Sequence, residues 1–199
     1  MARSEPRPGL DEAAVLRAAA EIIDAEGARA LSLARLAAVL GVRPPSLYNH
    51  VDGLDGVWRG LAVMGVRALR DRLTRVAIGR SGEEAMVALA AAYRAFAKEH
   101  PGLYAASLRA PGPGEDALAA ASEETLAILR AVLAPYGLGA EAEVHALRAF
   151  RSVAHGFVSL ELAGGFGLPV ALDASYQALV RLLVAGLAHS AQSNAGQSE

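Results

Sequence analysis

The chain has 199 residues, of which 53% are hydrophobic and 20% are charged, and its formal net charge is −2. This composition excludes an intrinsically disordered chain, which would be poor in apolar residues and highly charged. The absence of cysteine excludes disulfide scaffolds, thiol nucleophiles and thiolate metal sites. Because the sequence shows neither a signal-peptide core nor 18 consecutive apolar residues, we expect a cytoplasmic protein without membrane contact.

The first predicted helix follows a short irregular segment. Residues 1–9 are rich in proline and charge and show no period, so we expect a flexible arm there. Apolar residues then recur at helical spacing, which predicts a helix over 11–26, with Asp11 as N-cap and Gly27 after its end. Ser32 is a good N-cap for the next helical pattern.

Two short helices separated by a tight turn come next. The apolar spacing predicts a helix over 33–40, and Gly41 follows its end. A second helix is predicted over 44–50, because its two prolines stand in the first turn, where proline is tolerated. Leu47 and Val51 form its apolar i, i+4 pair. This arrangement is typical of a helix-turn-helix.

The remainder of the chain is also predicted to be helical. Ser81 to Glu84 match a capping box, and Pro101 stops the helix that follows it. The further helices are expected at 54–78, from Ser81 to His100, and at 102–108, 115–134, 140–164 and 173–189. The sequence therefore predicts an all-α fold of about nine helices. We expect a helix-turn-helix domain at 10–56, a helical domain for ligand binding and dimerisation at 57–190, and a disordered tail at 191–199.

The predicted helix at 44–50 has an unusual outward side. If Leu47 and Val51 pack inward, uncharged groups face out, namely Pro45, Ser46, Tyr48, Asn49 and His50. A face selected only for solubility would carry Glu and Lys. Hydroxyl groups can bind phosphates, and asparagine can pair with an adenine edge in the major groove. This face favours binding to DNA, although two short helices with a glycine turn also occur in many other all-α proteins.

The segment from Gly27 to Val57 resembles the DNA-binding domain of TetR-type transcriptional regulators. Its most specific part is Leu47-Tyr48-Asn49-His50-Val51. The resemblance implies double-stranded operator DNA as a partner, with phosphate contacts at Tyr48 and His50. The residues that it places at DNA are Ser32, Leu33, Arg43, Pro44, Pro45, Ser46, Tyr48, Asn49 and His50. The family usually has Ser or Thr as N-cap where Arg43 stands and a basic residue at Leu54, so one phosphate contact is expected to be missing.

Two later segments, 93–104 and 154–161, resemble a branch of TetR C-terminal domains that is named for a Trp–His–Gly signature. Arg151 stands at the tryptophan position. The candidate pocket residues for an unknown small-molecule effector are Trp58, Leu61, Met64, Tyr93, Phe96, Tyr104, Leu126, Arg151, His155 and Phe157. Aromatic residues and Met at helical spacing are also typical of a plain core. Arg151 either needs an anionic partner or is exposed.

The segment 144–162 carries apolar groups on nearly all sides, so a helix there must be buried all round. One side would pack on the core, and another would pack on a second copy. The helix at 173–189 would join it through apolar residues, which are Leu179, Leu182, Leu183, Val184 and Leu187. We expect a homodimer through these two helices. The alternative is a larger core in a monomer.

The sequence gives little support for a catalytic function, because it contains no nucleophile elbow, no phosphate-binding loop and no zinc-protease motif. The histidines show no metal-ligand spacing, and no catalytic residue, metal or cofactor is expected. The sequence favours a homodimeric TetR-like regulator, most often a repressor in that family, which a small molecule releases from a palindromic operator. The alternatives are a helical protein that binds small molecules without regulating DNA, and an all-α enzyme.

Overall fold

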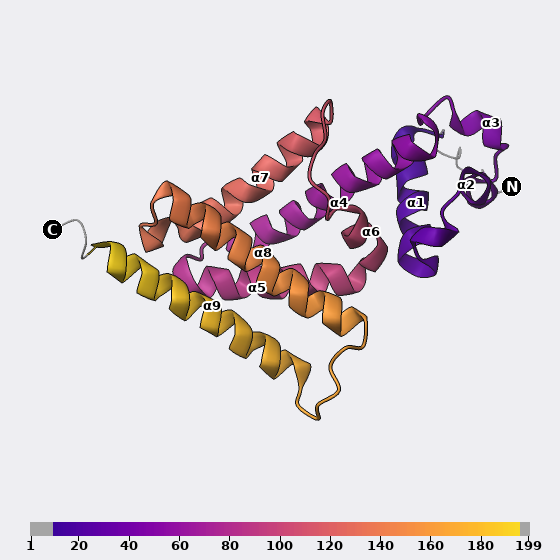
Figure 1. Ribbon diagram of the computed structural model, residues 1–199. Coiled ribbons are helices and arrows are strands. Elements are labelled where there is room, and N and C mark those ends of the chain that lie inside the picture. Colours follow the sequence, from indigo (N-terminus) through magenta and orange to yellow (C-terminus); the bar gives the residue numbers. More distant parts are fainter. Residues whose placement is uncertain (1–9, 196–199) are drawn as a thin grey trace, which may run out of the picture. The chain divides into compact units, whose positions relative to one another are not determined.

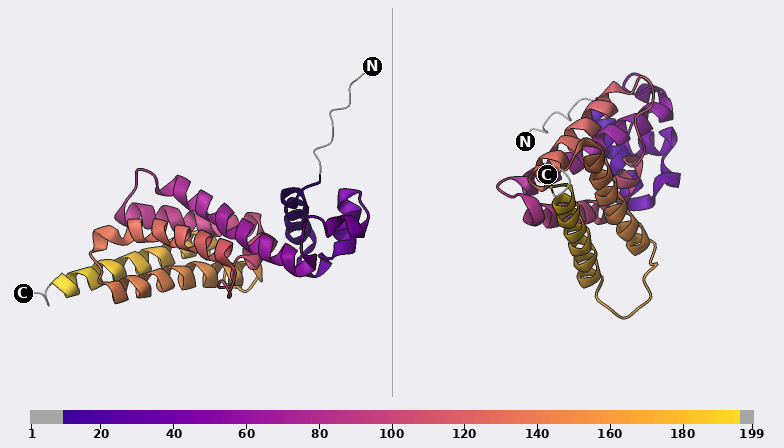
Figure 2. Two further views of the ribbon diagram at one scale, coloured as in Figure 1. Left: turned by 90° about the horizontal axis from the view of Figure 1, so that it is seen from above. Right: turned by 60° about the vertical axis from the view of Figure 1, so that its left-hand side comes forward.

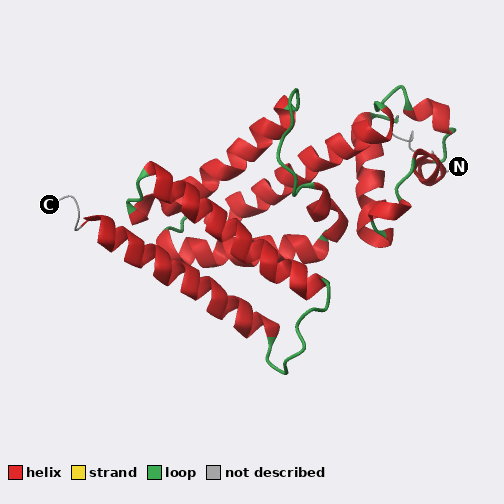
Figure 3. Ribbon diagram, viewed as in Figure 1, coloured by secondary structure: helices red, strands yellow, loops and turns green. Residues whose placement is uncertain are grey.

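The computed structural model describes residues 10–195, with side chains to His189, and this part of the chain consists of helices and connecting loops (Figures 1 and 3). The prediction of an all-α fold is confirmed. The α-helices are α1 (Glu12–Glu26), α2 (Leu33–Leu40), α3 (Pro44–Leu47), α4 (Gly53–Ala77), α5 (Gly82–Glu99), α6 (Pro101–Ala106), α7 (Asp116–Leu133), α8 (Ala140–Leu162) and α9 (Leu172–Ala195). Two 3-10 helices that the sequence analysis did not predict are η1 (Ala28–Ala30) and η2 (Ala134–Tyr136).

The chain folds into two compact units. The first unit contains the described residues up to Gly65 together with Pro101–Arg109, and the second contains Val66–His100 and the chain from Ala110 onward. Helix α4 therefore contributes residues to both units. The boundary predicted from the sequence lies between residues 56 and 57, and the sequence pattern does not predict that 101–109 belong with the N-terminal helices.

The first unit owes its local structure to residues that cap helices. The Asp11 side chain accepts a hydrogen bond from Ala14 N at 2.7 Å, and Ser32 Oγ accepts one from Arg35 N at 3.1 Å. Gly41 follows α2 in the left-handed conformation, with φ of 68°, which glycine adopts without strain. These three features confirm the predicted start of α1 and both ends of α2.

Helix α6 packs against the end of α1 within the first unit. Leu103 N donates a hydrogen bond to Asp24 Oδ1 at 2.8 Å. A Cβ atom on Gly102 would lie 2.3 Å from the carbonyl oxygen of Ile23, and one on Gly65 would lie 2.8 Å from the carbonyl oxygen of Leu103. The two glycines therefore allow backbones to approach more closely than any larger residue could.

Gly102→Ala is expected to lower the free energy of unfolding by about 1–3 kcal/mol, because the added methyl group overlaps the α1 backbone. Urea denaturation of both proteins measures the change. Gly167→Ala is the matched control, since a Cβ atom there meets nothing within 4 Å. Equal stability of the Gly102 and Gly167 variants would contradict tight packing between α6 and α1.

The core of the second unit lies among α5, α7, α8 and α9. Helix α5 contacts α7, α8 and α9, and α8 contacts α7 and α9; Figure 2 shows α5, α8 and α9 from two further sides. Their buried side chains follow helical spacing and include Met86, Leu89, Tyr93, Phe96, Leu118, Leu133, Phe150, Phe157 and Val180. Small alanines between these large side chains let the helices pack closely.

Three expectations about helix ends were wrong. Helix α3 ends at Leu47 rather than residue 50, because the chain turns there and His50 N and Val51 N both donate to the Leu47 carbonyl. The Ser81 side chain caps no backbone group of α5, and Glu84 pairs with Arg80 instead of completing a capping box. Helix α9 continues to Ala195, into the expected tail at 191–199, because no glycine or proline stands between Gly186 and Gly196. The expected arm at 1–9 lies outside the described residues.

Candidate nucleic-acid interface

Helices α2 and α3 are joined by a closed three-residue turn. Gly41 N donates to the carbonyl oxygen of Ala38 at 3.3 Å, and Val42 N donates to that of Ala37 at 3.0 Å. Arg43 then takes an extended conformation as the N-cap of α3. The backbone hydrogen bonds keep the turn compact, so α3 follows α2 in a defined direction, as a helix-turn-helix requires.

The inward and outward sides of α3 differ as the sequence predicts. Leu47 is fully buried and Val51 is 7% exposed, which confirms the apolar pair. On the other side, the Tyr48 side chain is 63% exposed. Among the other residues expected at DNA, Ser32, Arg43, Pro44, Pro45 and Asn49 are exposed, and Leu33, Ser46 and His50 are half-buried. The helix therefore exposes a nearly uncharged polar surface, and the buried side chains of Leu47 and Val51 hold its opposite side against the first unit.

Two of these side chains keep hydrogen-bonding capacity for a ligand. Ser32 Oγ already accepts from Arg35 N, but its hydroxyl hydrogen can still be donated to an acceptor such as a phosphate. Arg43 forms no side-chain hydrogen bond to α3, so it does not replace the Ser or Thr cap that is usual in TetR-type proteins. Its exposed guanidinium can serve either a phosphate or a guanine.

Carboxylates neutralise part of the positive charge of the first unit. Arg35 Nη2 lies 2.6 Å from Glu26 Oε1, and its hydrogen bond holds the pKa of Glu26 below the ordinary value. Arg59 Nη2 lies 2.7 Å from Asp52 Oδ2. Both pairs are exposed. The positive charges of Arg35 and Arg59 are therefore largely offset by neighbouring carboxylates.

The second unit contains a polar cluster that joins α5, α8 and α9. From α5, Arg94 Nε and Nη2 donate to the two carboxylate oxygens of Glu161 at 2.7 and 2.8 Å, and Lys98 Nζ lies 2.8 Å from Glu161 Oε1. Arg94 Nη1 also lies 2.8 Å from Asp173 Oδ1 at the start of α9. The hydrogen bonds from Arg94 lower the pKa of Glu161 to about 2. We name Arg94, Lys98, Glu161 and Asp173 the Arg94 cluster.

Aromatic rings surround the guanidinium of Arg94. Its central carbon lies 5.7 Å from the ring centre of Phe157 and 5.1 Å from that of Tyr176. Burial raises the pKa of Tyr176, whose hydroxyl donates to the carbonyl oxygen of Ala90 at 2.7 Å. Sequence reasoning missed this cluster, although Arg94 and Lys98, four residues apart on one predicted helix, could have indicated a site for a carboxylate.

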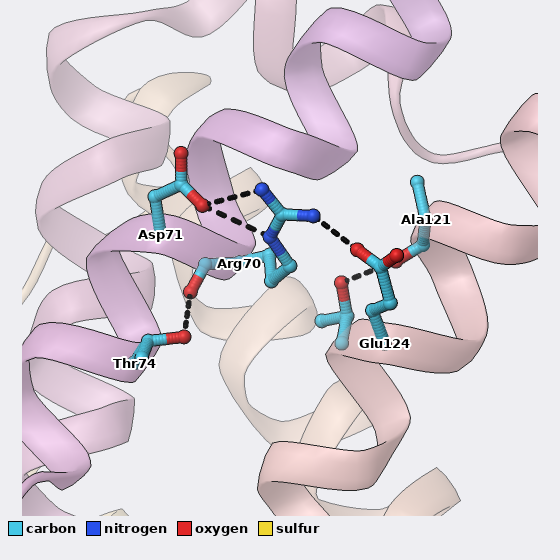
Figure 4. Close-up of polar contacts among 6 residues, drawn as sticks. Arg70, Asp71, Thr74, Ala121 and Glu124 are labelled. Atoms are coloured by element: carbon cyan, nitrogen blue, oxygen red, sulfur yellow. Dashed lines mark hydrogen bonds and ion pairs between the residues drawn. The ribbon is translucent and has the colours of Figure 1, made fainter.

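The second half of α4 is tied to two neighbouring helices by arginines. Figure 4 shows the Arg70 guanidinium between Asp71 on the same helix, with Nη2 2.6 Å from Oδ1, and Glu124 on α7. Arg72 pairs with Glu99 of α5 and lies 5.9 Å from the ring centre of Phe96. These contacts fix α4 between α5 and α7 within the second unit.

The candidate pocket residues are divided between the two units. Trp58, Leu61, Met64 and Tyr104 belong to the first unit, and Tyr93, Phe96, Leu126, Arg151, His155 and Phe157 belong to the second. Several of them pack on other rings: Tyr93 meets Phe150 edge-on at 6.4 Å, and Phe157 lies 4.9 Å from Tyr176. Ser159 Oγ lies 3.3 Å from His155 Nδ1. Two alternatives were open for Arg151, a buried side chain with an anionic partner or an exposed side chain. The structure shows that Arg151 is exposed.

Two grooves of the second unit are lined by residues that were not among these candidates. One groove, of about 470 Å³, lies between α5 and α9 and includes Arg94, Lys98 and Asp173. The other, of about 640 Å³, lies between α8 and α9 and is mostly apolar. Its walls are formed by Leu138, Ala142, His145, Ala146, Ala149, Leu182, Leu183, Gly186, Leu187 and His189.

Apolar side chains remain exposed on α8, α9 and their connecting loop. The exposed fractions of Leu182 and Leu168 are 72% and 83%. Val144, Leu160, Leu162, Phe166 and Val170 are also exposed. Helix α8 therefore buries one side in its own unit and leaves other apolar residues uncovered, which agrees with the all-round apolar pattern of its sequence.

Within residues 10–195, no helix has the length and apolarity needed to cross a membrane. In the same part of the chain, no group of three His, Asp or Glu side chains is placed to hold a metal ion.

Comparison with known proteins identifies relatives over nearly the whole chain. The family model of the tetracyclin repressor-like C-terminal domain matches residues 86–183. An uncharacterised HTH-type transcriptional regulator of Mycobacterium tuberculosis, Rv0681, is 37% identical over 187 residues, which are 93% of this chain and 85% of the relative. The HTH-type transcriptional regulator YobS of Bacillus subtilis is 37% identical over 183 residues, covering 92% of this chain and 95% of YobS.

The fold is also shared with solved structures. A TetR variant from Acinetobacter baumannii in complex with minocycline superposes with a TM-score of 0.66 and 23% identity, covering 89% of this chain and 96% of that chain. The likeness to the Trp–His–Gly branch stays a prediction. The helix-turn-helix geometry and the identity to regulators over most of the sequence show that this chain belongs to the TetR family of DNA-binding transcriptional regulators.

Proposed function

We propose that α3 enters the major groove of operator DNA with Tyr48 and Asn49 foremost. The observation that carries this proposal is the exposed, nearly uncharged polar side of α3 above the buried Leu47. Tyr48 and His50 would donate hydrogen bonds to phosphates, and Asn49 would pair with an adenine edge. Ser32 and Leu33, at the start of α2, would lie against the backbone of the same half-site.

We further propose that a second copy of the chain covers the apolar residues of α8 and α9. Proteins of this family dimerise and bind DNA. A two-fold pair would bury Leu182 and its exposed neighbours and would present two copies of α3 to one duplex. Half-sites one helical turn apart, about 34–36 Å, would then form a palindromic operator.

The second unit is the proposed receptor for a small-molecule effector that releases the operator. In support, the matching family model is described as repressor-like, and the similar TetR variant was solved with minocycline. The candidate contacts in this unit are Tyr93, Phe96, Leu126, His155 and Phe157. Because linkage is reciprocal, DNA must weaken effector binding by the factor by which effector weakens DNA binding, with a coupling of roughly 1–3 kcal/mol.

Asn49→Ala is expected to weaken binding to a selected duplex by about tenfold for each half-site, because a paired adenine edge is lost. The duplex is first selected from a random pool by the wild-type protein, and fluorescence anisotropy then gives the affinity of each variant. Gln177→Ala, an exposed amide in the second unit, is the matched control and should bind normally.

The dependence of affinity on salt separates this function from small-molecule binding alone. Phosphate contacts release counterions, so the logarithm of the affinity should fall steeply as the logarithm of the salt concentration rises. Unchanged affinity of Asn49→Ala for the selected duplex, at wild-type thermal stability, would rule out the proposed placement of α3. A failure to select any duplex would refute regulation through DNA.

A further inference from the structure

The groove between α5 and α9 has a charged end and an apolar end. At the charged end, Arg94 Nη1 of α5 lies 2.8 Å from Asp173 Oδ1 in the first turn of α9. One turn further along α9, the Tyr176 hydroxyl donates to the carbonyl oxygen of Ala90, one turn earlier on α5, at 2.7 Å. The two helices are therefore antiparallel along the groove, and its other end is lined by Ala91 and Tyr176.

The two cations at the charged end keep hydrogen-bond donors for a further anion. The Arg94 guanidinium has five N–H groups, of which three meet the carboxylates of Glu161 and Asp173 within the described chain. The Lys98 ammonium has three N–H groups, and one meets Glu161 Oε1 at 2.8 Å. Glu99, which also lines the groove, is paired with an arginine of α4 instead. The charged end therefore suits a carboxylate ligand.

Asp173 is the carboxylate of this cluster that a ligand can replace most easily. Its side chain is 80% exposed and meets Arg94 at one nitrogen. The Glu161 side chain is only 9% exposed, and it accepts two hydrogen bonds from Arg94 and one from Lys98. An exposed ion pair adds little stability, because water screens it. Exchanging Asp173 for another carboxylate therefore costs little, whereas exchanging Glu161 does not.

The rest of the groove suits a short apolar chain. Ala91 and Ala95 form part of its α5 wall, and Tyr176, which also lines it, is 3% exposed. Ala91 and Lys98 are seven residues apart, so the α5 wall runs for about 10 Å along the helix. The groove volume of about 470 Å³ lies within the range of small-molecule sites, about 300–1,000 Å³.

We propose that this groove binds a small aliphatic monocarboxylate. The carboxylate of the ligand accepts hydrogen bonds from Arg94 and Lys98 in place of Asp173, whose side chain returns to water. The ligand chain lies along Ala91 and Ala95. Asp173 is thus an internal competitor for the site, and binding releases the first turn of α9 from α5. The inference concerns neither α3 nor DNA, and the groove includes none of the candidate effector contacts.

Octanoate is the probe, and isothermal titration calorimetry on the full chain measures its affinity. Asp173→Asn should bind octanoate about five- to tenfold more tightly than wild type, because asparagine pairs more weakly with Arg94 and does not repel the ligand. Lys98→Met should weaken binding about tenfold, because a charged donor is lost. Octan-1-ol has the same chain without the charge, and it should bind at least about tenfold more weakly than octanoate.

Two exposed side chains outside the groove provide matched controls. Asp116→Asn removes a carboxylate from the first turn of α7, and Arg75→Met removes a cation from the last turn of α4. Both variants should bind octanoate as the wild-type protein does. If octanoate binds neither wild type nor Asp173→Asn, or binds Asp173→Asn no more tightly, the inference is overturned. Equal affinity in all variants would place octanoate elsewhere in the protein and would overturn it as well. The proposed function stands in each of these cases.

Discussion

Arg94→Met is expected to lower the free energy of unfolding by about 3–5 kcal/mol, the usual cost of removing one partner of a buried ion pair. The Arg94 and Glu161 side chains are only 12% and 9% exposed. Without the guanidinium, the Glu161 carboxylate loses two hydrogen bonds and keeps only Lys98 among the described pairings. Methionine retains an apolar chain between Phe157 and Tyr176, so most of the loss reflects charge rather than volume. Urea denaturation at pH 7 measures it.

The matched control is Arg80→Met, which breaks an exposed pair between Arg80, in the loop before α5, and Glu84 in the first turn of α5. The two side chains are 40% and 72% exposed, so water screens their attraction. The expected loss is below about 0.5 kcal/mol. Similar losses in the two variants would show that the Arg94 cluster behaves as an ordinary surface pair.

The dependence on pH distinguishes charge from packing in the Arg94 cluster. In the folded protein the pKa of Glu161 is lowered from 4.5 to about 2, chiefly by the hydrogen bonds from Arg94. A lowered folded-state pKa contributes stability that is complete above pH 4.5 and is lost as the pH falls towards 2. The difference between wild type and Arg94→Met should therefore narrow below pH 4.5. If the difference in the free energy of unfolding stays constant from pH 7 to pH 3, the loss in Arg94→Met comes from packing rather than from charge.

The Arg94 cluster also bears on the proposed dimer. Glu161 lies in the last turn of α8, and Asp173 lies in the first turn of α9. By pairing with both, Arg94 holds these two turns against α5 on either side of a loop that is exposed throughout. The helices proposed to meet a second copy are thus fixed in place within their own unit, which reduces the entropy lost on association.

The parts of the fold that the sequence predicted well are those decided by neighbouring residues. Asp11 and Ser32 bond to backbone groups three residues away, and Gly41 ends α2 through its own backbone freedom. The burial of Leu47 likewise follows from helical spacing. Because Leu47 packs inward, the side of α3 that carries Tyr48 faces outward, as predicted. The candidate DNA-binding surface was predictable because it lies within one short segment.

Features that depend on distant residues were not predictable from spacing. Arg94 and Glu161 are 67 positions apart, and only the packing of α5 against α8 brings them together. Residues 101–109 join the first unit because Gly102 permits close contact with Ile23, which a linear pattern does not reveal. The candidate pocket was uncertain for the same reason, since an aromatic residue at helical spacing can pack on a ring, as Phe157 does on Tyr176, or face a cavity.

Leu182→Glu is expected to convert the proposed dimer into a monomer. Leu182 is 72% exposed on α9 and lines the apolar groove between α8 and α9. In a two-fold interface the substitution would bury two carboxylates, one from each copy, at a cost of several kcal/mol. Light scattering at micromolar concentration should then give the mass of one chain, where the wild-type protein gives two.

The same variant should bind the full operator about 10²–10⁴-fold more weakly, because the two half-sites no longer act through one linked protein. Ile78→Glu is the matched control, since Ile78 is 71% exposed but follows α4 and lies outside α8 and α9. It should remain dimeric and bind fully. Affinity for a single half-site should be equal in all three proteins, because α3 belongs to the first unit. A dimeric Leu182→Glu protein with full operator affinity would place the interface elsewhere.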